Sequence, residues 1–273
     1  MLIDKKLFKK YFQKDHKHSF VNLDLNIFTE LREMEEQGLF KSSGHRAFAF
    51  GYTWLIHYLW KYSKYGNQEI NTQDIKTILG ISPIEKRVNY IIKKGGLFDC
   101  VGYTEHTRDF PIYSEFTKFE GLKITQLSDL DNMLAEGFLK QYNTRYACKK
   151  PLMGYERKGS KDLGLFFSRH DALPLSLFEF SRCVLCREIG LNGFFAYAFL
   201  KYKIKLNGYR ATRVYYSEFK KELGFSEKKT RGILNTLKDA GMISVVKVVT
   251  KNNSKAGFCQ NNMYSLAHRG KHD

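Results

Sequence analysis

Residues 228–238 bring together side chains that hydrogen-bond well to nucleic-acid bases: Lys228, Lys229, Arg231, Asn235 and Lys238. Lys and Arg can donate to O6 and N7 of guanine, and Asn can form two hydrogen bonds with adenine. The opposite side of a helix through this segment carries a stripe for packing: Thr230, Ile233, Leu234 and Leu237. The spacing therefore predicts a helix that packs by one face and presents base-edge donors on the other.

The residues on either side predict how this helix is held. Gly224 suits the left-handed position that ends a preceding helix, and Ser226 suits the N-cap of the helix that follows. We expect Ser217 to cap the preceding helix and to place Lys220 and Lys221 close to phosphate groups. A β-hairpin pattern follows, with strands at 243–250 and 262–266. Its tip, at residues 251–257, is expected to reach the nucleic acid through Lys251, Asn253 and Lys255.

A second copy of this order of elements begins about 144 residues earlier. Leu79-Gly80-x-Ser82 matches Leu223-Gly224-x-Ser226, and the tripeptide at 96–98 matches that at 241–243. Ser82, Pro83 and Glu85 have the spacing of an N-cap, a first-turn proline and a capping-box acid, so a third helix is expected from Pro83 to Phe98.

The first copy carries its own candidate site residues. Its expected third helix buries Ile84, Val88 and Ile91. The candidates on its outer face are Lys86, Arg87, Asn89 and Lys93. A shorter hairpin pattern follows, with strands at 100–103 and 110–113 and a tip at 105–108.

This order of a helix, a short helix, a tight turn, a third helix and a hairpin resembles the winged-helix DNA-binding fold. The resemblance covers about 70 residues in each copy. Two such units in one small basic chain are similar to plasmid and phage replication initiators. The resemblance implies a mainly α fold with small β-hairpins (α+β) and two winged-helix (helix-turn-helix) units. It also implies that the third helix enters the major groove of DNA.

The charge distribution favours a polyanionic partner for the C-terminal half. The net charge is +17; residues 1–139 hold 19 Lys/Arg and 18 Asp/Glu, whereas residues 140–273 hold 26 and 10. A positive excess confined to one half attracts nucleic acid. We therefore expect an N-terminal domain at 1–140, with extra helices, and a basic DNA-binding domain at 141–273.

The sequence gives little indication of catalysis, metal binding or membrane insertion. It has no GxxxxGK[ST] loop, no GxGxxG after a strand and no nucleophile elbow, so we expect no enzyme activity and no cofactor. Cys183 and Cys186 have the spacing of a metal pair, but a zinc site needs four ligands and only His170 lies near. The five scattered cysteines suit a reducing cytoplasm, and no apolar run reaches membrane-spanning length.

These observations lead to one leading hypothesis and two alternatives. The leading hypothesis is a sequence-specific double-stranded DNA-binding protein of the replication-initiator type, associated with a plasmid or the nucleoid. The first alternative is a transcription regulator of the same architecture, which requires the same docking chemistry. The second alternative is a winged-helix protein-interaction module. Segments 31–39 and 127–142 are expected to be helical and offer possible surfaces for a homodimer.

Overall fold

The computed structural model describes residues 5–12, 19–42, 44–67, 69–117, 121–142, 147–153, 157–158, 161–162, 172–251 and 258–266. These residues form a mixed, mainly helical structure with small antiparallel sheets, so the expected α+β class is confirmed. The α-helices are α1 (Lys5–Phe12), α2 (Ile27–Glu36), α3 (Gly44–Lys61), α4 (Thr72–Ile78), α5 (Asn89–Ile92), α6 (Leu97–Cys100), α7 (Asn132–Tyr142), α8 (Leu177–Val184), α9 (Gly190–Leu206), α10 (Tyr216–Leu223) and α11 (Glu227–Asp239). Short 3₁₀ helices are η1 (Lys64–Asn67) and η2 (Leu127–Asp129). None of the described helices is long and apolar enough to cross a membrane.

The strands pair locally and across the chain. They are β1 (Phe20–Asp24), β2 (Thr104–Thr107), β3 (Pro111–Thr117), β4 (Gly121–Gln126), β5 (Cys148–Pro151), β6 (Arg157–Lys158), β7 (Lys161–Asp162), β8 (Ala172–Ser176), β9 (Thr212–Arg213), β10 (Ile243–Lys251) and β11 (Phe258–Leu266). Two-stranded sheets join β1 to β8, β2 to β5, β3 to β4 and β6 to β7. The remaining sheet has the order β10–β11–β9.

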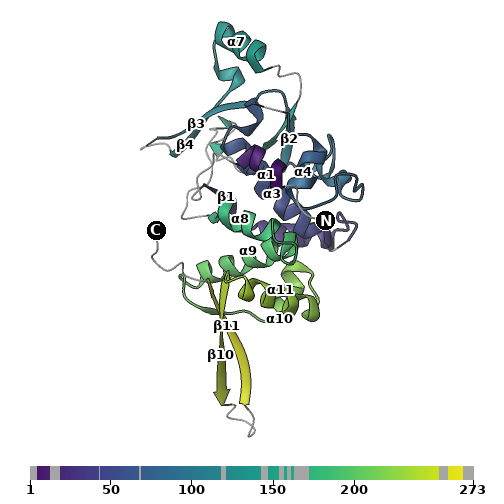
Figure 1. The fold of residues 1–273 in the computed structure, drawn as a ribbon, viewed down its shortest axis with the longest axis vertical. Helices are drawn as coiled ribbons and strands as arrows, with labels where there is room; N and C mark the ends of the chain where they lie inside the picture. Colours follow the sequence, from purple (N-terminus) through teal and green to yellow (C-terminus); the bar gives the residue numbers. More distant parts are fainter. Residues whose placement is uncertain are drawn as a thin grey trace.

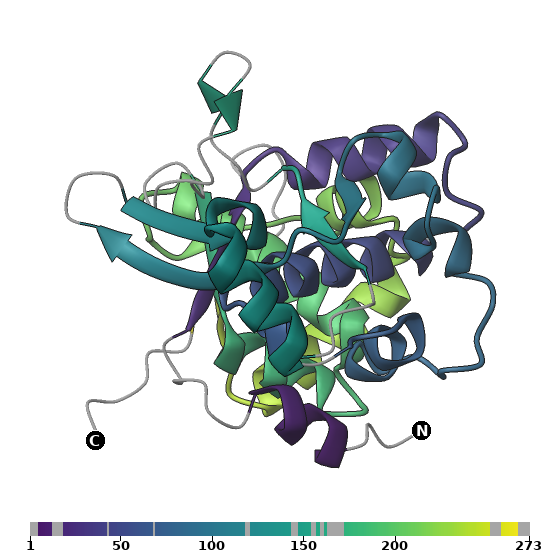
Figure 2. The same ribbon diagram turned by 90° about the horizontal axis from the view of Figure 1, so that it is seen from above.

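Two helices without a broad polar face, α3 and α9, lie at the centre of the molecule (Figures 1 and 2). A helix that is apolar all round is stable only when it is covered on every side. Glycine lets these two helices pack closely, because a Cβ on Gly51 of α3 would lie 2.6 Å from Leu191 Cδ2 of α9. Aromatic rings fill the space around them, with Trp54 stacked 4.0 Å from Phe180.

The two halves of the chain share this core. Strand β1 pairs with β8 in a register that places Phe20 opposite Ser176. Phe28 of α2 packs against Phe195 of α9 at 5.7 Å. The expected division near residue 140 therefore separates two segments that contact each other extensively.

The prediction of a third helix over residues 83–98 is wrong. Residues 81–88 form a series of turns, Ile84 is 81% exposed, and helix occurs only in the short α5 and α6. In a helix the Arg87 N–H would donate to Pro83 O. Instead Lys76 Nζ donates to Pro83 O at 3.2 Å, and the Arg87 N–H donates to Glu85 Oε1 at 2.8 Å. The side chains of Lys76 and Glu85 therefore form hydrogen bonds with two backbone groups that would bond to each other in a helix.

The prediction of a hairpin over residues 100–113 is also wrong. Residues 104–107, which include most of the expected tip, are strand β2 and pair with β5, more than 40 residues further along the chain. Strand β3 pairs with β4 instead. Both β2 and β5 are held by Asp99, which accepts hydrogen bonds from Thr104 Oγ1 at 2.6 Å and from Lys149 Nζ at 2.5 Å.

From α9 to β11 the chain has the expected order of three helices and a hairpin, with an additional short strand, β9, between α9 and α10. Gly224 ends α10 with φ 69°, and Ser226 Oγ accepts the Lys229 N–H at 3.3 Å at the start of α11. Ser217 is not the N-cap of α10, which begins at Tyr216; Glu218 accepts the Tyr215 N–H there at 2.9 Å. Strand β9 pairs with β11 at the base of the hairpin.

Candidate nucleic-acid interface

Helix α11 has one buried face and one exposed face, as its sequence predicts. Thr230, Leu234 and Leu237 are buried, and Thr230 Oγ1 also donates to Ser226 O at 3.0 Å. The candidate contact residues are exposed: Lys228, Lys229, Arg231, Asn235 and Lys238. The helix lies between α9 and the outer surface, beside α10 and next to the start of the hairpin (Figure 1). Its exposed face is therefore accessible to a large partner.

Two of these side chains are held by neighbours. Arg231 Nη2 lies 2.7 Å from Glu227 Oε1, with the two side chains 62% and 61% exposed. An ion pair as exposed as this contributes little stability, so the guanidinium can exchange its carboxylate for another acceptor. Lys229 Nζ donates to Asn192 Oδ1 of α9 at 3.0 Å and lies 4.1 Å from the Phe225 ring centroid. Partial burial of its ammonium group against these neighbours lowers the pKa of Lys229. Lys229 therefore braces the start of α11 on α9, unlike Lys228, Asn235 and Lys238.

Helix α10 presents Lys220 and Lys221 to solvent while its end is fixed by the N-terminal half. Arg46 of α3, which is buried, donates from Nη1 to Glu222 O at 2.9 Å and pairs with Glu35. Arg32 of α2 pairs with the Glu222 carboxylate at 2.7 Å. These contacts hold the last turn of α10, immediately before the turn that leads into α11.

The β10–β11 hairpin projects from the body of the molecule at the end opposite α7 (Figure 1). Lys251, the last residue of β10, pairs through its backbone with Phe258. Asn253 and Lys255 lie outside the described residues, so their contacts with nucleic acid remain predictions. The projection of the hairpin gives the α11 face a second element that can reach along an extended partner.

The candidate residues of the first copy do not form one helix face. Lys86 and Arg87 lie in the turns before α5, Asn89 begins α5 and Lys93 follows its end. The Arg87 guanidinium is held by Glu85 at 2.7 Å. Because the helix that was to align them is absent, these four side chains do not reproduce the arrangement on α11.

Sequence reasoning missed Gly232, which lies in the middle of the exposed face of α11. A Cβ built on Gly232 meets nothing within 4 Å, so no packing inside the chain requires glycine there. Glycine in a helix interior costs about 1 kcal/mol relative to alanine. A glycine inside an otherwise regular helical pattern is the sequence feature that could have drawn attention to this position. No contact within the described part of the chain accounts for glycine at this position.

The two segments expected to offer homodimer surfaces differ in exposure. Helix α2 buries Ile27, Phe28, Leu31 and Met34 within the chain, so its apolar face is already covered. Helix α7 leaves Met133 and Leu134 exposed. Of the two, only α7 presents large apolar side chains to solvent.

The two cysteines differ in their surroundings, and Cys186 is partly exposed beyond the end of α8. Cys183 is buried, with its Sγ 3.7 Å from Met242 Sδ, and Cys186 Sγ lies 3.2 Å from Glu188 Oε2. Within the described part of the chain, no three His, Cys, Asp or Glu side chains come together as metal ligands.

Comparison of the chain with protein-family models, with curated proteins and with solved structures finds no match in any of the three. The chemistry of the α11 face and its surroundings is therefore the basis for a functional proposal.

Proposed function

We propose that the chain is a sequence-specific double-stranded DNA-binding protein of the replication-initiator type, and that α9–β11 is a winged-helix unit whose helix α11 lies in the major groove. The observation that carries the proposal is the exposed face of α11. It presents Lys228, Arg231, Asn235 and Lys238 opposite a buried stripe, in the half of the chain that holds almost all of the net charge.

Different parts of the unit make different kinds of contact with DNA. Arg231 and Asn235 supply the bidentate geometry that distinguishes guanine and adenine in the major groove. Lys220 and Lys221 on α10 supply phosphate contacts, which fix the position of the unit without reading sequence. The projecting hairpin adds contacts beyond the groove occupied by α11 (Figure 1).

A selection experiment tests this proposal. A pool of random-sequence duplexes is bound to the full chain at two salt concentrations, and the bound fraction is sequenced. We expect an enriched motif, and a motif that recurs as neighbouring repeats favours an initiator over a transcription regulator. Binding without enrichment would exclude sequence-specific recognition, and a lack of binding at low salt would favour the protein-interaction alternative.

The Gly232→Ala variant is expected to stabilise the protein and yet weaken DNA binding. Alanine raises the free energy of unfolding by about 0.5–1 kcal/mol because it favours the helix. Its methyl group then occupies the space where the DNA approaches the helix, so the dissociation constant rises about 10-fold, which corresponds to about 1.4 kcal/mol. Urea denaturation and duplex titration measure the two effects.

The matched control for this variant is Gly137→Ala in α7. Gly137 is also exposed in a helix, and a Cβ built on it meets nothing within 4 Å. The control should gain similar stability and keep wild-type affinity. Unchanged or tighter DNA binding by Gly232→Ala would contradict a close approach of DNA to α11.

A further inference from the structure

The last turn of α8 contacts the junction at which α11 leads into β10. Arg182 Nη2 donates to Ala240 O, the carbonyl of the C-cap residue of α11, and Cys183 Sγ lies 3.7 Å from Met242 Sδ. Met242 is buried and directly precedes β10. Two adjacent side chains of α8 therefore hold this junction, one on its α11 side and one on its β10 side.

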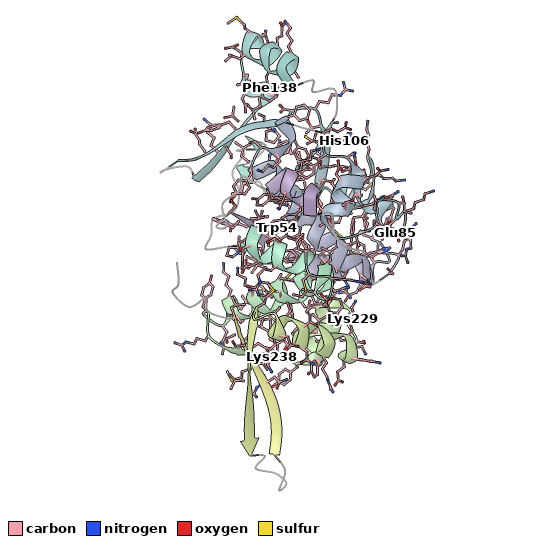
Figure 3. The ribbon with its side chains drawn as sticks, viewed as in Figure 1. Trp54, Glu85, His106, Phe138, Lys229 and Lys238 are labelled. Carbon is pink, nitrogen blue, oxygen red and sulfur yellow. The ribbon has the colours of Figure 1, made fainter. Side chains whose placement is uncertain are left out.

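This junction sets the position of the hairpin relative to α11. Gly241 has φ +62° and turns the chain, and the Met242 N–H donates to Leu237 O at 2.9 Å. In Figure 3 Lys238 lies at the end of α11 from which the hairpin starts, whereas Lys229 lies nearer the other end. A change at the junction therefore displaces Lys238 and the base of the hairpin together.

The backbone brings Cys183 and Cys186 close enough for a disulfide bond. The Cys186 N–H donates to Cys183 O at 3.3 Å and closes a four-residue turn. The first and last Cα atoms of such a turn are less than about 7 Å apart, and a disulfide spans a Cα separation of about 4.4–6.8 Å. In the thiol form Cys183 Sγ contacts Met242, and Cys186 Sγ contacts Glu188 Oε2 at 3.2 Å. A disulfide therefore requires both sulfur atoms to leave their present partners.

The two thiols differ in access, which sets the order in which they react. Cys186 is partly exposed, whereas Cys183 is fully buried. Burial raises the pKa of Cys183 well above its usual value, and the negative charge of Glu179 raises it further. Because the thiolate is the reactive form, a reagent from solvent reacts first with Cys186. Cys183 reacts when the last turn of α8 opens.

Closing a disulfide here acts on both contacts with the junction. Cys183 Sγ leaves Met242 Sδ, so the buried thioether loses a packing partner. Arg182 directly precedes Cys183, so opening of this turn also moves the guanidinium away from Ala240 O. The last carbonyls of a helix have no partner within it, so the end of α11 then lacks this donor.

We infer that Cys183 and Cys186 form a thiol–disulfide exchange site for a small-molecule disulfide, and that closing their disulfide releases the α11–β10 junction and weakens duplex binding. The effect on duplex binding rests on the proposed function. A disulfide formed between cysteines of one turn changes this junction without any contact between the reagent and the DNA-binding face.

The exchange proceeds in two balanced steps. The Cys186 thiolate attacks one sulfur of the small disulfide and displaces one thiolate, which leaves a mixed disulfide on Cys186. The Cys183 thiolate then attacks Cys186 Sγ and displaces the second thiolate. Two protein thiols are thus oxidised to one disulfide, and the small disulfide is reduced to two thiols. The protons lost by the two cysteines are taken up by the released thiolates.

The test compares the full chain after treatment with oxidised glutathione and after reduction with dithiothreitol. Trypsin cleaves after Arg182 and Arg187, so one peptide, residues 183–187, contains both cysteines, and the disulfide lowers its mass by two hydrogen atoms. We expect the disulfide to form and the dissociation constant for the enriched duplex to rise about 10-fold, within the usual range of coupling between sites. The amides of residues 240–243 should exchange faster with deuterium, and dithiothreitol should reverse all three changes.

Two variants serve as controls. Cys186→Ser cannot form the disulfide and keeps the contact between Cys183 and Met242, so its affinity should not respond to oxidised glutathione. Cys100→Ser removes another exposed thiol and should retain the full response of the wild-type chain.

Three results would overturn the inference. They are a 183–187 peptide without the disulfide, unchanged amide exchange and affinity after the disulfide has formed, and an equal response of Cys186→Ser. Absence of salt-sensitive duplex binding by the reduced wild-type chain would instead overturn the proposed function. Amide exchange at residues 240–243 would then still decide whether the disulfide releases the junction.

Discussion

The Arg231→Ala/Asn235→Ala variant is expected to lose most of the discrimination between the enriched duplex and a scrambled duplex. Each bidentate contact contributes about 1–3 kcal/mol of discrimination, so together they account for about 2–6 kcal/mol. Binding to the scrambled duplex should fall much less. The variant removes only one positive charge, that of Arg231, and the lysines of α10 and α11 remain to contact the phosphates. Competition titrations with the two duplexes measure the specificity ratio.

A matched control separates this effect from a general loss of charge. Asn132→Ala/Lys140→Ala removes one amide and one cation from α7, an exposed helix distant from α11 (Figure 1). It should retain the wild-type specificity ratio. An unchanged ratio in the Arg231→Ala/Asn235→Ala variant would show that α11 does not read bases through these two side chains.

The Arg46→Ala variant is expected to lower the free energy of unfolding by about 3 kcal/mol. Arg46 is 4% exposed, and its removal leaves Glu35 without its partner and Glu222 O without a donor. Breaking a buried pair costs about 3–5 kcal/mol, and partial exposure of the Glu35 carboxylate places the expected value at the lower end. Urea denaturation at neutral pH measures the change.

The control for this prediction is Arg231→Ala. Its ion pair with Glu227 spans i to i+4 and is mostly exposed, so its loss should change the free energy of unfolding by at most about 0.5 kcal/mol. If Arg46→Ala were equally mild, the contact between the N-terminal half and the end of α10 would not support the fold. A large effect would mean that the contact between Arg46 and the end of α10 contributes to the stability of the whole fold.

Local signals made the turn between α10 and α11 and the buried stripe of α11 predictable from sequence. Gly224 ends α10, Ser226 begins α11, and the apolar stripe faces inward, because each depends on residues within one or two helical turns. The same local signals failed at Ser82–Glu85, where Lys76 takes Pro83 O and Glu85 takes the Arg87 N–H. A capping pattern does not reveal that side chains compete for the helix hydrogen bonds.

The contacts between distant segments could not be predicted. The β2–β5 pairing joins residues more than 40 positions apart, so the loss of the first hairpin is not encoded in a local pattern. The same holds for Arg46 and Glu222, which are 176 residues apart in sequence and meet because α3 and α10 pack around a shared core. In α11 the exposed set of side chains followed from the spacing of the residues, whereas the hydrogen bond from Lys229 to Asn192 is visible only in the structure.

The salt dependence of duplex binding by the wild-type chain tests the central claim most directly. With about six phosphate contacts from α10, α11 and the hairpin, a plot of log affinity against log salt should have a slope of about −5. The measurement is a titration of the enriched duplex between about 50 mM and 200 mM salt, where affinity should fall about 1,000-fold. A slope close to zero would contradict a DNA-binding role for the basic C-terminal half.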